Sequence, residues 1–370
     1  GDGQQLVAGV AGHPATLSHF GTLTAMLVDL RSDTVTRPTA EMRRAMAEAE
    51  VGDDVYGVDP TARRLEAAAA ERTGKEAGLF TSSGTLANQL ALATWAGDGE
   101  QVILDAASLF VLWEPASMAL ISRAVPAPVP TERGWFGPEE VAARLAAPAY
   151  GTTRTGLVCV ENSHNAAGGT VYPQDVLEEL GSFCRERSIP LHMDGARLFN
   201  AAVASGRSAA ELAAPADSVM FCLSKGLGAP VGSVLCGPRD FIDEARVLRQ
   251  VLGGGMRQVG VLAAPGLVAL ETMVDRLAED HRRARRLAEG LAEIPGVRID
   301  LDRVETNLVI FELLGMPAPE LQDRLAEHGV LCFWVTPRKI RMVLHHQVDD
   351  DGVERALRAT REVLASAPPG

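Results

Sequence analysis

The chain has 370 residues, 46% hydrophobic and 22% charged, a composition typical of folded globular proteins. Its net charge is −13, so it lacks the excess of positive charge that binds a phosphate backbone, and we expect no nucleic-acid partner. No run reaches the about 18 consecutive apolar residues of a membrane helix, so we expect no membrane association. The length exceeds what one core usually serves and predicts two domains.

Residues 1–27 contain no Lys or Arg and lack the charged start of a signal peptide, so we expect an extension outside the fold. The cysteines form no CxxC pair, and we expect no metal site. An odd, scattered set of thiols predicts free cysteines in a reducing compartment, hence a cytoplasmic protein. They are Cys159, Cys184, Cys222, Cys236 and Cys332.

Short apolar runs alternate with longer helical patterns from residue 78 onward. This alternation predicts a mainly parallel sheet covered by helices on both faces. Strands are expected at 78–81, 101–104, 157–161, 190–194, 218–223 and 232–236. Helices are expected at 85–95, 138–146, 173–187 and 209–213.

One long helix at 263–294 is expected to lead into a second, smaller domain. That domain would hold strands at 306–312 and 340–344 and a helix at 318–328. The expected division is therefore an extension at 1–27, a large domain at 28–270 and a small domain at 271–370.

Three segments carry chemistry, and each follows an expected strand. In open α/β sheets, ligands bind at the carboxyl ends of the strands. The first segment is Ser83-Gly84-Thr85, which precedes an apolar helix. Free N–H groups at a helix N-terminus bind phosphate, although the same residues also serve as an ordinary cap.

The second segment ends a strand with Asp194, and the third places Lys225 directly after another strand, before a turn rich in glycine. A carboxylate can hold the cationic ring nitrogen of pyridoxal 5′-phosphate (PLP), and a partly desolvated lysine is a nucleophilic amine that forms a Schiff base. Each residue alone is usually a turn aspartate or a surface lysine. Together the three segments predict a PLP enzyme acting on an amino acid.

Seven motifs resemble the threonine aldolases of the β-eliminating lyase group, and the resemblance runs from about residue 28 to the C-terminus. The motifs are LRSDTVTRPT at 30–39, GDDVYG at 52–57, SGT at 83–85, ENSHN at 161–165, HMDGAR at 192–197, SKGLGAP at 224–230 and GGGMRQ at 253–258. The resemblance implies fold type I of the PLP enzymes, which resembles aspartate aminotransferase. This fold has a large PLP-binding domain with a mainly parallel seven-stranded sheet flanked by helices, plus a smaller C-terminal α+β domain.

The resemblance also implies the roles of individual residues. Lys225 would carry PLP and Asp194 would pair with its ring nitrogen, while Ser83, Gly84 and Thr85 would hold the phosphate. The substrate carboxylate would bind Ser32, Arg197 and Arg341, with Arg197 also near the cofactor. Tyr56 and Arg257 would reach the site of a neighbouring subunit in a homotetramer built from dimers. The implied reaction is retro-aldol cleavage of a threonine-type β-hydroxy-α-amino acid to glycine and an aldehyde.

One departure concerns proton transfer. The family usually has a histidine stacked on the PLP ring, where this chain has Leu109, or Phe110 after a one-residue shift. The base that takes the β-hydroxyl proton is then His164, Tyr150 or a phosphate oxygen acting through water. The departure keeps other reactions on the same scaffold open, namely transaldolation, β-elimination and racemisation. A protein that only binds PLP is disfavoured by the intact lysine and aspartate, and a Rossmann-type nucleotide binder by the missing GxGxxG motif.

Overall fold

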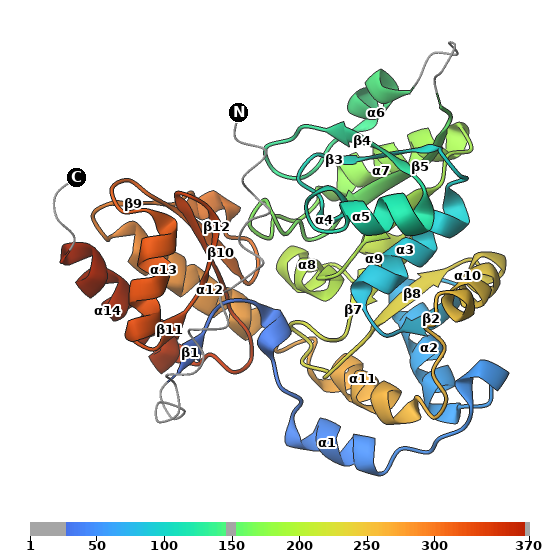
Figure 1. The fold of residues 1–370 in the computed structure, drawn as a ribbon, viewed down its shortest axis with the longest axis horizontal. Coiled ribbons are helices and arrows are strands. Elements are labelled where there is room, and N and C mark those ends of the chain that lie inside the picture. Colours follow the sequence, from blue (N-terminus) through green and yellow to red (C-terminus); the bar gives the residue numbers. More distant parts are fainter. Residues whose placement is uncertain (1–26, 146–152, 367–370) are drawn as a thin grey trace. The chain divides into compact units, whose positions relative to one another are not determined.

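A mainly parallel sheet lies at the centre of Thr36–Leu277, the larger of the two units into which the chain divides (Figure 1). The computed structural model describes residues 27–145 and 153–366, and within these ranges the sheet has seven strands. Strand β8 runs antiparallel to both neighbours, and the others share one direction. Their order is β2 (Ala77–Thr81), β8 (Ser233–Gly237), β7 (Ser218–Cys222), β6 (Leu191–Asp194), β5 (Thr155–Glu161), β3 (Gln101–Asp105) and β4 (Val125–Val129).

The expected fold class is confirmed, and the sequence missed only β4 among the strands of this sheet. That strand reads Val-Pro-Ala-Pro-Val, and its prolines, Pro126 and Pro128, argue against a central strand. In the structure β4 is the edge strand and pairs with β3 alone. Proline is tolerated there because an edge strand leaves half of its N–H groups without a ladder partner.

Successive residues of each strand face opposite sides of the sheet and build two cores. In β2, Leu79 belongs to a core shared with α3 (Gly84–Trp95) and α10 (Arg239–Val251). The next residue, Phe80, belongs to the core on the other face, with α2 (Pro60–Thr73) and other helices. Those other helices include α7 (Gln174–Glu186), α8 (Leu198–Ser205), α9 (Ala209–Ala213) and α11 (Gly260–Thr272). The remaining helices of this unit are α1 (Ala40–Ala47), η3 (Asp54–Tyr56), α4 (Leu109–Leu112), α5 (Pro115–Ser117), η4 (Met118–Ser122) and α6 (Pro138–Arg144).

The single helix expected at 263–294 is wrong, because the structure has α11 and, after a break, α12 (Leu277–Ala292). The break falls where the buried residues change from one core to another. Met273 and Leu277 are buried in the core of the larger unit, whereas Leu287 and Leu291 are buried in that of the smaller unit. Residues 273–276 contain neither glycine nor proline, so the sequence carried no signal for the break.

In the described part of the chain, the smaller unit combines residues 27–35 with residues 278–366. In its described part, an antiparallel sheet has the order β12 (Phe333–Thr336), β13 (Lys339–Val343), β10 (Leu308–Leu313) and β9 (Val297–Arg298). A separate parallel pair joins β1 (Val28–Asp29) to β11 (Val330–Leu331). The remaining elements are η2 (Asp33–Val35), η5 (Leu301–Arg303), α12, α13 (Ala318–Glu327) and α14 (Asp350–Ala365). Residues 28–35, expected in the large domain, thus lie in the smaller unit, and the boundary falls at Leu277 rather than at residue 270.

A buried ion pair fixes the loop that carries η3 to the sheet of the larger unit. Arg249 of α10 donates to Asp54 Oδ2 at 2.6 Å and to the carbonyl of Phe80 at 2.6 Å. Both charged side chains are almost completely buried. Removing one partner would leave the other charge uncompensated in a dry surrounding, which is costly.

We expect Arg249→Met to lower the free energy of unfolding by about 3–5 kcal/mol, the usual cost of breaking a buried pair. Urea denaturation of the cofactor-free protein measures this change. Arg154→Met is the control, because Arg154 is 81% exposed in its pair with Glu100 and should contribute only about 0–1 kcal/mol. Equal effects of the two substitutions would contradict the stabilising role of the buried pair.

Candidate active site

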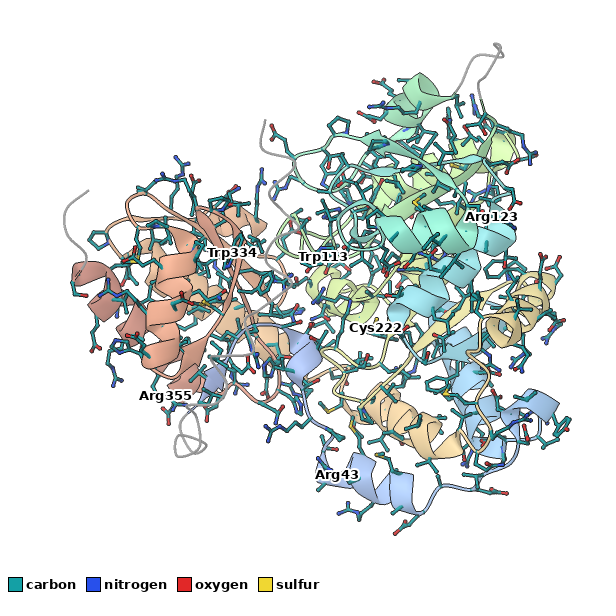
Figure 2. The ribbon with its side chains drawn as sticks, in the orientation of Figure 1. Arg43, Trp113, Arg123, Cys222, Trp334 and Arg355 are labelled. Atoms are coloured by element: carbon teal, nitrogen blue, oxygen red, sulfur yellow. The ribbon has the colours of Figure 1, made fainter. Side chains whose placement is uncertain are left out.

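Helix α3 begins near the carboxyl end of β2 with Ser83, Gly84 and Thr85. The Ser83 hydroxyl caps the helix by accepting a hydrogen bond from Leu86 N at 3.1 Å. A Cβ atom on Gly84 would lie 2.9 Å from Sγ of Cys222, the last residue of β7 (Figure 2), so the helix can start this close to β7 only with glycine. Thr85 is exposed. The free N–H groups of the first turn and the helix dipole make this end suitable for an anion.

Asp194 is a buried carboxylate at the carboxyl end of β6, only 1% exposed. Its Oδ2 accepts a hydrogen bond from Asn88 Nδ2 at 3.0 Å, and its Oδ1 accepts one from Ala196 N at 2.9 Å. Burial, with a contribution from the charge of Glu161, raises the pKa of Asp194 to about 6, although the charge of Lys225 acts in the opposite direction. A cation brought to this carboxylate would stabilise its ionised form.

A chain of buried side chains fixes the amide that contacts Asp194. Trp95 Nε1 donates to Ser218 Oγ at 2.8 Å, and Ser218 Oγ lies 2.8 Å from His192 Nδ1. His192 Nε2 lies 3.4 Å from Asn88 Oδ1. Burial lowers the pKa of His192 to about 3, so the ring is neutral. With the ring proton on Nε2, every group in the chain donates to the next, and the Asn88 amide N–H points to Asp194.

Lys225 follows β7 in a tight turn. Ala229 N donates to the carbonyl of Leu223 at 3.0 Å, and Gly228 N donates to that of Lys225 at 2.9 Å. The hydroxyl of Thr36 donates to the same Lys225 carbonyl at 3.1 Å. Gly228 has a φ of +76°, which glycine adopts without strain. These contacts hold the backbone of the half-buried lysine close enough to Asp194 for its charge to act on that carboxyl.

His164 lies in the turn after β5 and is 1% exposed. Its Nε2 is 3.1 Å from Asp105 Oδ1 and 3.8 Å from Glu161 Oε2, and its Nδ1 accepts a hydrogen bond from Ala167 N at 3.2 Å. Burial lowers the pKa of His164, but the two carboxylates outweigh burial and hold it above its ordinary value. In the neutral ring the proton belongs on Nε2, facing Asp105, because Nδ1 is an acceptor.

Glu161 joins the turn after β5 to the start of α4. Its Oε2 accepts from Leu109 N at 3.1 Å, and its Oε1 accepts from Asn165 N at 2.8 Å. Leu109 is partly exposed, whereas Phe110 is buried in the core with residues of β3 and β5. Phe110 therefore cannot replace Leu109 over a ring in the site. Arg197 is buried after β6, and its Nη1 donates to Asn165 Oδ1 at 3.3 Å.

Ser32 and Arg341 belong to the smaller unit. Arg341 Nη2 donates to the carbonyl of Arg31 at 3.4 Å, which places this arginine beside the backbone next to Ser32. The Arg341 guanidinium also lies 5.6 Å from the ring centroid of Phe333, its partner across β12 and β13. The structure thus places Arg341 against the residue that precedes Ser32, and both were expected to bind a carboxylate from this part of the chain.

Tyr56 and Arg257 lie close together in the larger unit. Arg257 Nη1 is 3.0 Å from Asp53 Oδ2, and its guanidinium is 5.9 Å from the Tyr56 ring centroid. Tyr56 is 78% exposed. Neither side chain has a recorded contact with Asp194 or Lys225 among the described residues. Tyr150 and the loop at 148–152 lie outside the described residues.

Several buried polar atoms near the ends of β3 and β5 have no hydrogen-bond partner in the described ranges. They are Ser108 Oγ, Asn162 Nδ2 and Ser163 Oγ. Buried polar groups are normally paired, so such a group of atoms favours a bound polar molecule or water. The N-terminus of α3 suits an anion, the carboxylate of Asp194 suits a cationic ring, and the amine of Lys225 suits an aldehyde group. These groups and the unpaired polar atoms therefore fit a cofactor that carries all three features.

Two residues of this site had no role assigned from the sequence. Asn88 follows Gly84 by one helical turn, and that i, i+4 spacing could have placed it on the same face of α3. Glu114 lies between two short helices, and its carboxylate accepts from Gln89 Nε2 at 3.1 Å. No local pattern points to Glu114, because its partners come from another helix.

Comparison with known proteins gives a consistent result. The model of the family described as beta-eliminating lyase matches residues 29–313. Low-specificity L-threonine aldolase 1 of Arabidopsis thaliana is 42% identical over 91% of this chain and 96% of its own length. Low specificity L-threonine aldolase of Escherichia coli (strain K12) is 41% identical over 92% of this chain and its entire length. The solved threonine aldolase of Leishmania major has a TM-score of 0.80 at 19% identity, covering 91% of this chain and 99% of that one.

We expect Asp194→Asn to change how stability depends on pH. With the native pKa at about 6, above the ordinary value, the folded state holds this proton more tightly than the unfolded chain does. Wild-type stability is therefore lost as pH rises from about 4 through 6, by on the order of 2–3 kcal/mol. The variant lacks this loss, so its stability relative to wild type should rise over that interval. Urea denaturation from pH 4 to 7.5 measures the free energy of unfolding of both proteins. A difference between them that stays constant over this range would contradict the burial argument.

Proposed function

The chain belongs to the beta-eliminating lyase family, and on that premise we propose a PLP-dependent lyase that cleaves threonine to glycine and an aldehyde. Two curated relatives that each match over more than nine-tenths of the chain, from Arabidopsis thaliana and Escherichia coli, are named low-specificity L-threonine aldolases. Their names do not favour the alternatives of transaldolation, β-elimination or racemisation. We extend the proposal to threonine-type β-hydroxy-α-amino acids in general.

The observation that carries the proposal is the meeting of three groups at one edge of the sheet. The N-terminus of α3 can receive the phosphate through Gly84 and Thr85, with Ser83 as the cap. Asp194 can hold the ring nitrogen, and Lys225 Nζ can attach to the aldehyde carbon. Bound PLP supplies a cationic ring that accepts the electron pair released when the Cα–Cβ bond breaks.

The pKa of Asp194, about 6, bears directly on this role. Its ionised form is disfavoured by burial and favoured by a cation, so Asp194 pairs best with a protonated ring nitrogen. Asn88 and Ala196 N hold the two carboxylate oxygens in place for that contact. The carboxylate would therefore keep the ring in its electron-accepting state.

The substrate carboxylate is assigned to Ser32, Arg197 and Arg341, because a guanidinium presents two parallel donors to two carboxylate oxygens. The position of the Arg341 guanidinium over the Phe333 ring, 5.6 Å from its centroid, and its hydrogen bond to the Arg31 carbonyl support a fixed orientation of its donors.

Removal of the β-hydroxyl proton cannot involve Leu109, whose side chain has no basic group. His164 is buried between Asp105 and Glu161, with its Nδ1 occupied by Ala167 N. We propose that His164 contributes through Glu161 and Asp105 rather than by touching the substrate. Glu161 in turn holds the backbone of Leu109.

We further propose a homotetramer built from dimers that share their sites. Tyr56 is exposed at the end of η3, and the ion pair between Asp54 and Arg249 fixes η3 to α10. The outer face of α10 exposes Val247 and Val251 at 64% and 74%. If a second copy of the chain covers this face, Tyr56 and Arg257 of one copy would reach the site of the other.

A cytoplasmic location is supported by the free, buried state of the cysteines. Among the described helices, none is long and apolar enough to cross a membrane.

We expect the purified protein with PLP to release acetaldehyde and glycine from threonine, and Lys225→Ala to lose this activity completely. Without the amine, no side chain of the turn can attach the cofactor. A coupled assay of aldehyde release across a panel of β-hydroxy amino acids measures the activity. Full activity of Lys225→Ala, or no aldehyde from any substrate of the panel, would overturn the proposal.

For the carboxylate site, we expect Arg341→Ala to raise KM for threonine roughly 10- to 100-fold, the loss of charge-assisted hydrogen bonds. The affinity for PLP should stay the same, because Arg341 is assigned to the substrate alone. The KM of Arg341→Lys should lie between those of Arg341→Ala and wild type, because an ammonium group cannot contact both carboxylate oxygens as the planar guanidinium does. An unchanged KM for Arg341→Ala would show that the carboxylate binds elsewhere.

A further inference from the structure

Glu114 is a buried carboxyl group beside the exposed N-terminus of α3. It lies in the segment between Trp113 and Arg123, both labelled in Figure 2, and is 5% exposed. Its carboxylate accepts a hydrogen bond from Gln89 Nε2 at 3.1 Å and pairs with the hydroxyl of Thr85. Both partners belong to the first turns of α3, a helix of 12 residues. The carboxyl group is therefore next to the residue that is proposed to hold the phosphate.

The orientation of the Gln89 amide is fixed from the other side. Ser122 of η4 donates to Gln89 Oε1 at 2.6 Å, so the amide nitrogen must face Glu114. Without an anion nearby, Glu114 thus has two donors directed at it. Such an arrangement suits the ionised carboxylate.

The charged groups around Glu114 are Lys225, which follows β7, and Glu161 at the end of β5. Burial raises the pKa of Glu114, whereas the hydrogen bonds from Thr85 and Gln89 and the charge of Lys225 lower it. The net result is a pKa above the ordinary value for glutamate. The carboxyl group is thus sensitive to any further negative charge.

A phosphate at the N-terminus of α3 would add negative charge next to this carboxylate. Two like charges in a poorly solvated place are unfavourable, and a proton taken up by the carboxylate removes one of them. A protonated carboxyl group also has an O–H that can donate to a phosphate oxygen. We propose that Glu114 takes up a proton when the phosphate group of the cofactor occupies the N-terminus of α3. This inference rests on the proposed function, since it places that phosphate beside Thr85.

Calorimetric titration of the full-length, cofactor-free chain with PLP tests the proposal. Titrations at pH 8 in two buffers of different ionisation enthalpy give the number of protons taken up on binding. Wild type should take up more protons than Glu114→Gln, by up to one. Wild-type affinity should also fall relative to the variant as pH rises, by up to about tenfold per pH unit, the limit for one linked proton.

Two controls separate titration from structure. Ser122→Ala loosens the hold on Gln89 but keeps the carboxyl group, so its proton uptake should match wild type. Pyridoxal lacks the phosphate, and with pyridoxal wild type and Glu114→Gln should take up equal numbers of protons. Should Glu114→Gln fail to fold, Glu114→Ala replaces it in the same comparison, because it also removes the titrating carboxyl group.

Equal proton uptake by wild type and Glu114→Gln with PLP would overturn the inference, as would an equal difference with pyridoxal. Thr85→Ala distinguishes this failure from failure of the proposed function. If Thr85→Ala leaves the affinity for PLP unchanged, the phosphate site itself is misplaced. If it weakens PLP binding while proton uptake stays equal, only the role of Glu114 is wrong.

Discussion

The burial of Asp194 is the constraint on which the rest of the site depends. A carboxylate that is 1% exposed is stable in its ionised form only near positive charge and hydrogen-bond donors. The protein supplies the amide of Asn88, a backbone N–H and the charge of Lys225, yet the pKa remains at about 6. A cation beside this carboxylate would stabilise its ionised form, and we propose that a protonated ring nitrogen is that cation. An exposed aspartate would lack this preference because water would solvate its charge.

Helix α3 connects the parts of the site. Its first residue, Gly84, allows the helix to approach Cys222 at the end of β7, and Cys222 is three residues before Lys225 in the sequence. One turn later Asn88 reaches Asp194, and Gln89 reaches Glu114. One helix therefore positions the groups proposed for the phosphate, the ring nitrogen and the linked proton. A displacement of α3 would alter all of them together.

The sequence predicted the parts of the fold and site that depend on local pattern. Buried strands are marked by apolar runs, and Asp194 and Lys225 were recognisable because they directly follow such runs. What it missed depends on contacts distant in sequence. Strand β4 contains prolines that only its edge position explains, and β1 lies in the smaller unit because it pairs with β11, some 300 residues later. Glu114 is notable only beside Gln89 and Thr85.

The central claim is that Lys225 is the residue that carries the cofactor, and chemical trapping tests it most directly. The chain contains only three lysines, Lys75, Lys225 and Lys339. Lys75 Nζ already donates to the carbonyls of Ala213 and Ala216, and Lys339 is exposed. Incubation with PLP, reduction with borohydride, digestion and mass spectrometry should find the added pyridoxyl group at Lys225, with one group per chain. An adduct mainly on Lys75 or Lys339, or none on any lysine, would contradict the account.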